Sequence, residues 1–147
     1  MPLIKSMLSR RTSPVWMDNS TSTECSEISE KTAGSEYVQR KTGSVPMERF
    51  SGPQIRKFYK EEPEIYTRTA RIHLVSSFMA SVLTCSDAPI DYADGAGMNL
   101  MDLESCEWAS DILTAVAPDL KARLPSLAPS STNVGGISEF FVKKFGF

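Results

Sequence analysis

The extended segments of this chain are too few and too short to build a β-sheet of their own. Apolar residues predict one short buried strand at Ser13–Met17, and the Asp94-Gly95 pair predicts a turn between two further short pieces within residues 88–103. A pair of short strands is at best marginally stable alone. The sequence therefore predicts an α/β fold, rich in helix with a few short strands, that packs as part of something larger.

Signals for helices are stronger than signals for strands. Capping boxes at residues 21–24 (T-S-T-E) and 51–54 (S-G-P-Q) predict two helix starts, because each box satisfies otherwise unbonded backbone N–H groups. The most apolar helix is predicted at Arg71–Cys85, where apolar residues on more than one face predict close packing on more than one side. A last helix is predicted at Ser138–Phe145, with Gly146 as its stop.

Size and charge place the chain among ordinary globular domains. Its 147 residues fit one domain, and its formal net charge of −2 gives no general attraction to nucleic acid or anionic membranes. The most basic segment, residues 40–71, holds eight basic side chains against four acidic ones. Because this segment lacks aromatic platforms on which bases could stack, we expect no nucleic-acid partner.

Cysteine, histidine and apolar patterns exclude further classes. The three cysteines, Cys25, Cys85 and Cys106, show no C-x-x-C spacing, and a single histidine, His73, cannot form a His-pair zinc motif. A disulfide framework and a structural zinc are therefore not expected. No run approaches the ~20 apolar residues of a membrane span, and no apolar stretch follows the basic start as in a secretory signal. These features favour a cytoplasmic chain without a membrane partner.

Few residues form a recognisable chemical motif. The sequence contains neither G-x-x-x-x-G-K-[ST] nor G-x-G-x-x-G, so no nucleotide-phosphate loop is expected. A Ser-His-Asp triad would require His73, which the predicted helix at Arg71–Cys85 places in the core or on the helix surface. The aspartates of residues 91–102 fail the ligand spacing of a calcium loop. With Asn99, that segment either lines a polar cleft or forms a solvated turn.

Two shorter segments are candidates for ligand binding. Arg49 stands directly before the predicted helix start at Ser51, so its guanidinium and the N–H groups of that start both suit an oxygen-rich ligand such as a polyol or phosphate. The alternative is that Arg49 pairs with Glu48 or another nearby acid. Trp16 either stacks on a sugar face or, as is commoner for tryptophan, lies in the core, and Asp18 braces the helix that follows.

Four segments match the motifs of one known family. Residues 14–21 (P-V-W-M-D-N-S-T) are similar to a P-x-W-M-D-S-S-T motif, and residues 48–55 (E-R-F-S-G-P-Q-I) to an E-R-F-T-G-x-Q-I motif. Residues 74–81 resemble L-V-S-S-F-x-A-S, and residues 89–100 resemble P-I-D-x-x-D-G-x-G-M-N-L. In this order and spacing, from about residue 13 to the end, the segments resemble xylulose kinases of the eukaryotic type, within the FGGY family of carbohydrate kinases.

The resemblance implies a fold and a division of the chain. The family is similar to actin and hexokinase: two ribonuclease-H-like domains flank a cleft, the first holding most of the sugar and the second ATP. Residues 13–147 would then be part of the N-terminal, sugar-binding domain, preceded by a non-matching leader at residues 1–12. The family's Asp-x-Gly-Thr phosphate loop, its Gln-Gln-His-Gly sugar motif and its Gly-Asp-Asn segment with the catalytic Asp are not found in this sequence.

The resemblance also implies a function and one site residue. Arg49 matches the family's sugar-contacting arginine, whereas Trp16, Asp18 and residues 91–99 match motifs that we take as structural, and His73 replaces a typical serine. No catalytic or metal-binding residue is implied.

We therefore expect a fragment of an ATP-dependent kinase that acts on D-xylulose and is inactive alone. It would hold no cofactor itself, with Mg-ATP implied for the complete enzyme and the remainder of the kinase implied as its partner. The alternative is a non-catalytic, truncated product that binds only sugar or a protein.

Overall fold

Short helices dominate the computed structural model, which describes residues 7–147. The first six residues of the predicted leader, residues 1–12, lie outside this range. The elements in chain order are α2 (Ser22–Lys31), α3 (Ser35–Thr42), α4 (Ser51–Glu61), α5 (Pro63–Arg68), α6 (Val75–Thr84), β1 (Ile90–Asp91), α7 (Tyr92–Gly97), β2 (Met101–Asp102), β3 (Glu107–Trp108), α8 (Ser110–Val116), α9 (Leu120–Arg123), β4 (Leu127–Ala128) and α10 (Glu139–Phe145).

The strands form two separate pairs. β1 runs parallel to β4, with Ile90 opposite Leu127, and β2 runs antiparallel to β3, with Met101 opposite Trp108. Each sheet has only two strands of two residues within residues 7–147. This confirms the prediction of a helix-rich α/β fold with a few short strands.

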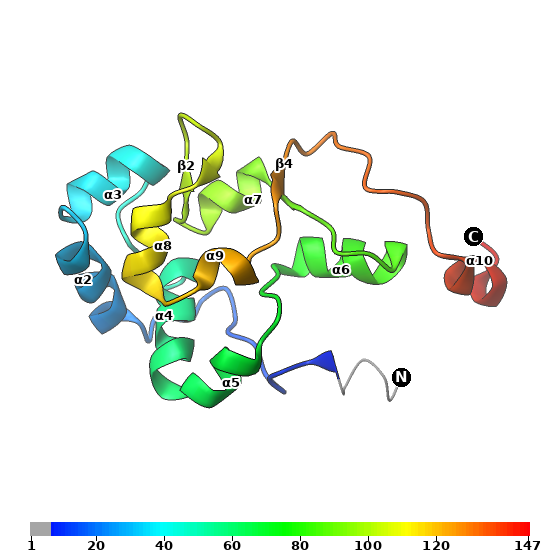
Figure 1. The fold of residues 1–147 in the computed structure, drawn as a ribbon, viewed down its shortest axis with the longest axis horizontal. Coiled ribbons are helices and arrows are strands. Elements are labelled where there is room, and N and C mark those ends of the chain that lie inside the picture. Colours follow the sequence, from blue (N-terminus) through cyan, green and yellow to red (C-terminus); the bar gives the residue numbers. More distant parts are fainter. Residues whose placement is uncertain (1–6) are drawn as a thin grey trace.

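The core lies where α2, α4 and α8 pack against one another (Figure 1). Ile28 of α2, Phe58 of α4, and Ile112 and Val116 of α8 are almost fully buried there. Such apolar burial is the main favourable term in folding. The core therefore depends on contacts between segments far apart in the sequence.

One buried charge ties these three helices together. Arg56 of α4 is 6% exposed, and its Nε donates to Glu27 of α2 over 2.6 Å. Its Nη1 donates to the carbonyl oxygens of Ala115 and Val116 over 2.8 and 3.1 Å. Because those carbonyls lie at the C-terminal end of α8, where helix acceptors have no internal partner, Arg56 satisfies them.

The most apolar helix is shorter and more exposed than predicted. α6 covers Val75–Thr84 rather than Arg71–Cys85 and ends at Cys85, whose backbone is left-handed. Only Ser77 of α6 is buried, while Val75 is 80% exposed and Met79 is 47% exposed. The expected packing on more than one side is therefore wrong, because no element within residues 7–147 covers the outer side of this helix.

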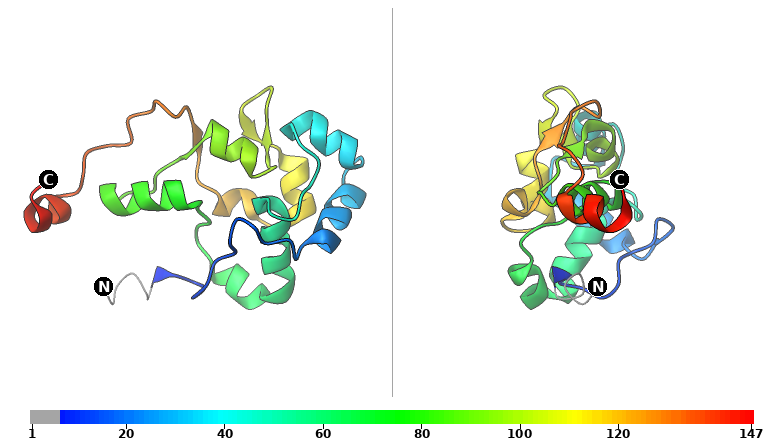
Figure 2. Two further views of the ribbon diagram at one scale, coloured as in Figure 1. Left: turned by 180° about the vertical axis from the view of Figure 1, so that it is seen from behind. Right: turned by 90° about the vertical axis from the view of Figure 1, so that its right-hand side faces the viewer.

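The end of the chain leaves the body of the molecule. After β4 a long extended segment leads to α10, which Figures 1 and 2 show on the far side of α6 from the core. The predicted last helix is confirmed, with Ser138 directly before it and Gly146, in left-handed conformation, directly after it. The N–H of Ser138 donates to the carbonyl of Leu83 over 2.8 Å, and no residue of α10 is buried.

Two local predictions are wrong. Residues 13–17 form no strand, and Val15 and Trp16 at its predicted centre are 65% and 76% exposed. A strand needs a partner for its backbone groups, and none lies beside this segment within residues 7–147. Asp94-Gly95 lies inside α7 rather than in a turn between strands.

Both predicted capping boxes lie at observed helix starts, but their side-chain hydrogen bonds to the helix do not form. α2 begins at Ser22 and α4 at Ser51, yet neither helix start has a side-chain cap. The side chains of Thr21 and Gln54, expected to cap these helices, bond elsewhere.

Candidate functional site

Arg49 lies in a tight turn directly before α4. The turn is closed by the N–H of Phe50, which donates to the carbonyl of Met47 over 3.0 Å. Arg49 is exposed, and its guanidinium carbon lies 6.0 Å from the centre of the Phe50 ring. No carboxylate of residues 7–147 lies within ion-pair distance of Arg49, although the charge of Arg49 contributes to lowering the pKa of Glu48. The guanidinium is therefore open to a ligand.

The start of α4 offers one backbone donor beside Arg49. Gly52 donates its N–H to a carbonyl of the neighbouring 98–101 segment, Gln54 donates within the helix, and Pro53 has no N–H. Among residues 7–147 the N–H of Ser51 has no hydrogen-bond partner. A guanidinium and one backbone donor can together bind neighbouring oxygens of a polar ligand.

Three side chains hold the residue before Arg49. The carbonyl oxygen of Glu48 accepts hydrogen bonds from Thr21 Oγ1 at 2.6 Å and from Gln54 Nε2 at 3.0 Å. The carboxylate of Glu48 accepts from Ser22 Oγ at 3.0 Å. A hydrogen bond from its own N–H, followed by the one from Ser22, lowers the pKa of Glu48 below its ordinary value. Glu48 therefore stays charged at neutral pH and holds the turn against α2.

Asp18 continues this network, whereas Trp16 stands outside the core. Asp18 Oδ1 accepts from the N–H and the hydroxyl of Ser20 at 2.9 and 2.5 Å and from Gln54 at 3.0 Å. The hydroxyl and then the N–H of Ser20, with Gln54 next, lower the pKa of Asp18 to about 2. Asp18 thus joins the segment before α2 to α4 and forms no hydrogen bond with the helix that follows it. The buried position expected of Trp16 is wrong, since 76% of it is exposed.

The acidic segment 91–102 is largely structural. Asp91 caps α7 by accepting from two N–H groups, those of Ala93 and Asp94, at 2.8 and 3.1 Å. Asn99 is 2% exposed and donates to the carbonyl of Ser44 at 2.7 Å. Asp102 pairs with Lys41 at 2.5 Å, and this bond lowers the pKa of the Asp102 carboxyl.

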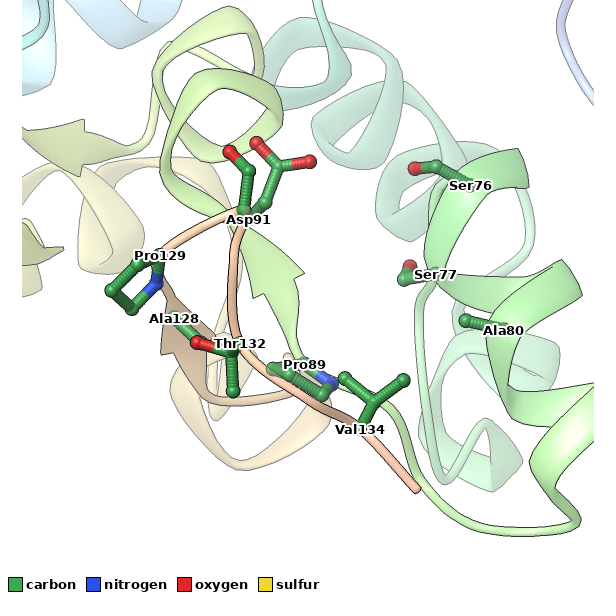
Figure 3. A pocket seen from close by; sticks show the side chains of 10 residues that line it. Ser76, Ser77, Ala80, Pro89, Asp91, Ala128, Pro129, Thr132 and Val134 are labelled. Atoms are coloured by element: carbon green, nitrogen blue, oxygen red, sulfur yellow. The ribbon is translucent and has the colours of Figure 1, made fainter. Parts of the chain in front are cut away.

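Asp91 also lines a cavity of about 200 Å³ at the carboxyl ends of β1 and β4. Figure 3 shows Ser76 and Ser77 of α6 on one side of it and Pro129 and Thr132 on the other. A second cavity of about 200 Å³ is lined by the side chains of Asp18, Gln54 and Lys57, among others. Arg49 lines neither cavity, so neither supports the predicted sugar site directly.

His73 lies between two polar groups but outside any helix. Its Nδ1 is 3.1 Å from Ser77 Oγ, and its Nε2 is 3.1 Å from an oxygen of Asp87. His73 lies in the extended segment before α6, so the predicted mid-helix position is wrong. Ser77 is 4% exposed and also bonds the carbonyl of Leu74. These contacts join the start of α6 to the loop after it, and the arrangement is structural.

Within residues 7–147 no three His, Cys, Asp or Glu side chains are grouped to hold a metal ion. In the same part of the chain no helix has both the length and the apolar character needed to cross a membrane.

The fold is that of sugar kinases. The crystal structure of a Plasmodium falciparum glycerol kinase with ADP superposes with a TM-score of 0.78 at 22% identity, covering 88% of this chain and 26% of that one. The model of the FGGY family of carbohydrate kinases, N-terminal domain, matches residues 11–147. The chain therefore belongs to the FGGY family of carbohydrate kinases, which confirms the resemblance and the predicted fold.

Two relatives are similar over most of the chain. Xylulose kinase 2 of Arabidopsis thaliana is 46% identical over 144 residues, which cover 98% of this chain and 26% of the relative. The xylulose kinase of Rattus norvegicus is 43% identical over 134 residues, which cover 91% of this chain and 25% of the relative. The chain thus spans about a quarter of the length of these relatives.

The hydrogen bonds that hold the turn containing Arg49 were not predicted from the sequence. Thr21 and Gln54 both carry capping-box signals, and these are local patterns. The contact from Thr21 to Glu48 spans 27 residues. No spacing rule links residues so far apart, so only the packing of α2 against α4 reveals this contact.

Proposed function

We propose that residues 13–147 form part of the sugar-binding domain of an ATP-dependent kinase that converts D-xylulose to xylulose 5-phosphate, with Arg49 contacting the sugar. The observation that carries the role of Arg49 is its open guanidinium beside the free N–H of Ser51. Two relatives that bear the name xylulose kinase, at 46% and 43% identity, support the choice of sugar. A cytoplasmic location follows from the same proposal.

The residues described here do not fit the Mg-ATP that such a kinase requires. No three His, Cys, Asp or Glu side chains of residues 7–147 are grouped to hold a metal ion, and the sequence contains no phosphate-loop motif. Phosphate transfer needs metal ions and donors around the transferred group. We therefore assign no step of the transfer to this chain and place Mg-ATP on the remainder of a complete enzyme.

The same observations favour a second candidate function. A chain that carries the sugar contact but lacks a phosphate-loop motif could act as a non-catalytic, sugar-binding product, or bind a protein through the exposed side of α6. If the isolated chain binds sugar but does not turn it over, the result favours this candidate over a kinase.

The role of Arg49 is tested by substitution in a complete kinase that contains this segment. Arg49→Ala should lower kcat/KM for D-xylulose roughly ten- to hundredfold, because hydrogen bonds to a charged group contribute about 1.5–3 kcal/mol. The KM for ATP should stay nearly unchanged. Arg49→Lys should restore only part of the loss, because an ammonium lacks the planar fork of donors.

Arg40→Ala is the matched control. Arg40 is also exposed, and its guanidinium carbon likewise lies 6.0 Å from the centre of an aromatic ring, that of Tyr37. Wild-type kinetics are expected for this variant. If Arg49→Ala behaves like Arg40→Ala while the protein stays folded, Arg49 does not contact the sugar.

A further inference from the structure

The peptide that leads into Arg49 is fixed by side chains from two other parts of the chain. The carbonyl of Glu48 and the N–H of Arg49 belong to the same planar peptide unit. Thr21 Oγ1 and Gln54 Nε2 both donate to this carbonyl, at 2.6 and 3.0 Å. The direction of the Glu48 carbonyl therefore sets the direction in which Arg49 leaves the turn.

Both donors are themselves held in place. Thr21 is fully buried. Its hydroxyl therefore cannot donate to a water molecule in place of the Glu48 carbonyl unless Thr21 leaves the core. Gln54 lies on α4, and its Nε2 also donates to Asp18 at 3.0 Å. Asp18 in turn is fixed by two hydrogen bonds from Ser20. The turn is thus anchored to a helix on one side and to the segment before α2 on the other.

This support matters because Arg49 has little else to position it. Its guanidinium forms no ion pair with residues 7–147, and its carbon lies 6.0 Å from the centre of the neighbouring Phe50 ring. A long, exposed side chain loses conformational freedom when it binds a ligand, and a fixed backbone reduces that loss.

We propose that Thr21 and Gln54 are positioning residues for Arg49 and set the affinity of the sugar site without contacting the sugar. The inference rests on the proposed contact of Arg49 with sugar. It assigns a role to two side chains that cap neither α2 nor α4.

The test compares single and double variants in a complete kinase that contains this segment. Thr21→Val keeps the shape of the side chain and removes the hydroxyl donor. It should raise the KM for D-xylulose roughly three- to tenfold, the size expected for one lost hydrogen bond. The KM for ATP should be unchanged. Gln54→Leu should act in the same direction.

Thr69→Val is the matched control, because Thr69 is also buried and its hydroxyl also donates to a carbonyl, that of Ile65, at 2.8 Å. It should leave the KM for D-xylulose unchanged. In the Arg49→Ala background, Thr21→Val should have no further effect, because the group it positions is gone.

The possible outcomes distinguish failure of the proposed function from failure of this inference. If Arg49→Ala leaves the KM for D-xylulose unchanged, the proposed function itself fails. If Arg49→Ala weakens sugar use but Thr21→Val behaves like Thr69→Val, or adds its full effect to Arg49→Ala, then Thr21 and Gln54 are structural and the inference is overturned. A thermal unfolding curve for each variant excludes loss of folding as the cause.

Discussion

At the scale of single residues, one carboxylate oxygen connects two parts of the chain that are far apart in the sequence. Asp18 Oδ1 accepts hydrogen bonds from Ser20 and from Gln54 of α4. Ser20 also receives a hydrogen bond from Lys57 Nζ at 2.8 Å. The charged form of Asp18 is favoured by all of these donors, which lower its pKa from 3.8 to about 2.

The lowered pKa of Asp18 predicts a defined pH dependence. Because the pKa in the folded state is below that in the unfolded state, the stabilisation is fully present above about pH 4 and is lost as pH falls toward about 2. Asn at this position has a similar shape but does not titrate. The urea midpoints of wild type and Asp18→Asn should therefore differ equally at about pH 7 and pH 4, and converge near pH 2. A difference that stays constant over the whole range would contradict this.

Residue patterns predicted the helix start beside Arg49 but not the long-range contact that supports its turn. A helix start at Ser51 was predictable because its signal lies within four residues. The bond of Thr21 to Glu48 was not, because it joins residues 27 positions apart and depends on how α2 packs against α4. Trp16 was expected in the core because it lies at the centre of a predicted buried strand, yet an apolar residue is buried only where another element covers it.

At the scale of elements, α6 and α8 show how far periodicity predicts burial. Both helices are apolar, and close packing was expected for the helix that became α6. Val116 of α8 is fully buried, whereas Val75 of α6 is 80% exposed. The sequence pattern identifies which residues share a face of a helix, but it does not identify the element that covers this face. The parallel pairing of β1 with β4 likewise depends on tertiary packing, which the sequence pattern does not identify.

The different burial of these two valines predicts effects of different size for the same substitution. Val116→Ala should destabilise the chain by about 1.5–3 kcal/mol, because it removes buried methyl groups and leaves a cavity. Val75→Ala should change the free energy of unfolding by less than about 0.5 kcal/mol, because its side chain is already in water. Urea titration of the two variants measures both values. Equal losses would show that α6 is covered in solution.

At the scale of the whole molecule, the chain contains a helical core and several uncovered apolar groups. Exposed large side chains gather on α6 and on the end of the chain, where Phe140 and Phe145 are 59% and 60% exposed. Figure 2 shows α10 well away from the core. The relatives are about four times as long as this chain. That ratio agrees with the sequence-based expectation of a fold that packs as part of something larger.

The isolated chain should show no kinase activity. Phosphate transfer requires metal ions and donors around the transferred group, and the sequence lacks both the family's phosphate-loop motif and its Gly-Asp-Asn segment with the catalytic Asp. An assay that couples ADP release to a colour change should remain at background with D-xylulose and Mg-ATP. A complete xylulose kinase in the same assay serves as the positive control. Sustained turnover by the purified chain would contradict the expectation.

Equilibrium binding of D-xylulose in the absence of nucleotide tests the central claim, that Arg49 binds the sugar, most directly. Calorimetric titration of a complete kinase that contains this segment separates this contact from the chemical step. Arg49→Ala should weaken the Kd for D-xylulose roughly ten- to hundredfold relative to wild type, while Arg40→Ala should leave it unchanged. An Arg49→Ala protein that is folded and binds D-xylulose as tightly as wild type would contradict the claim.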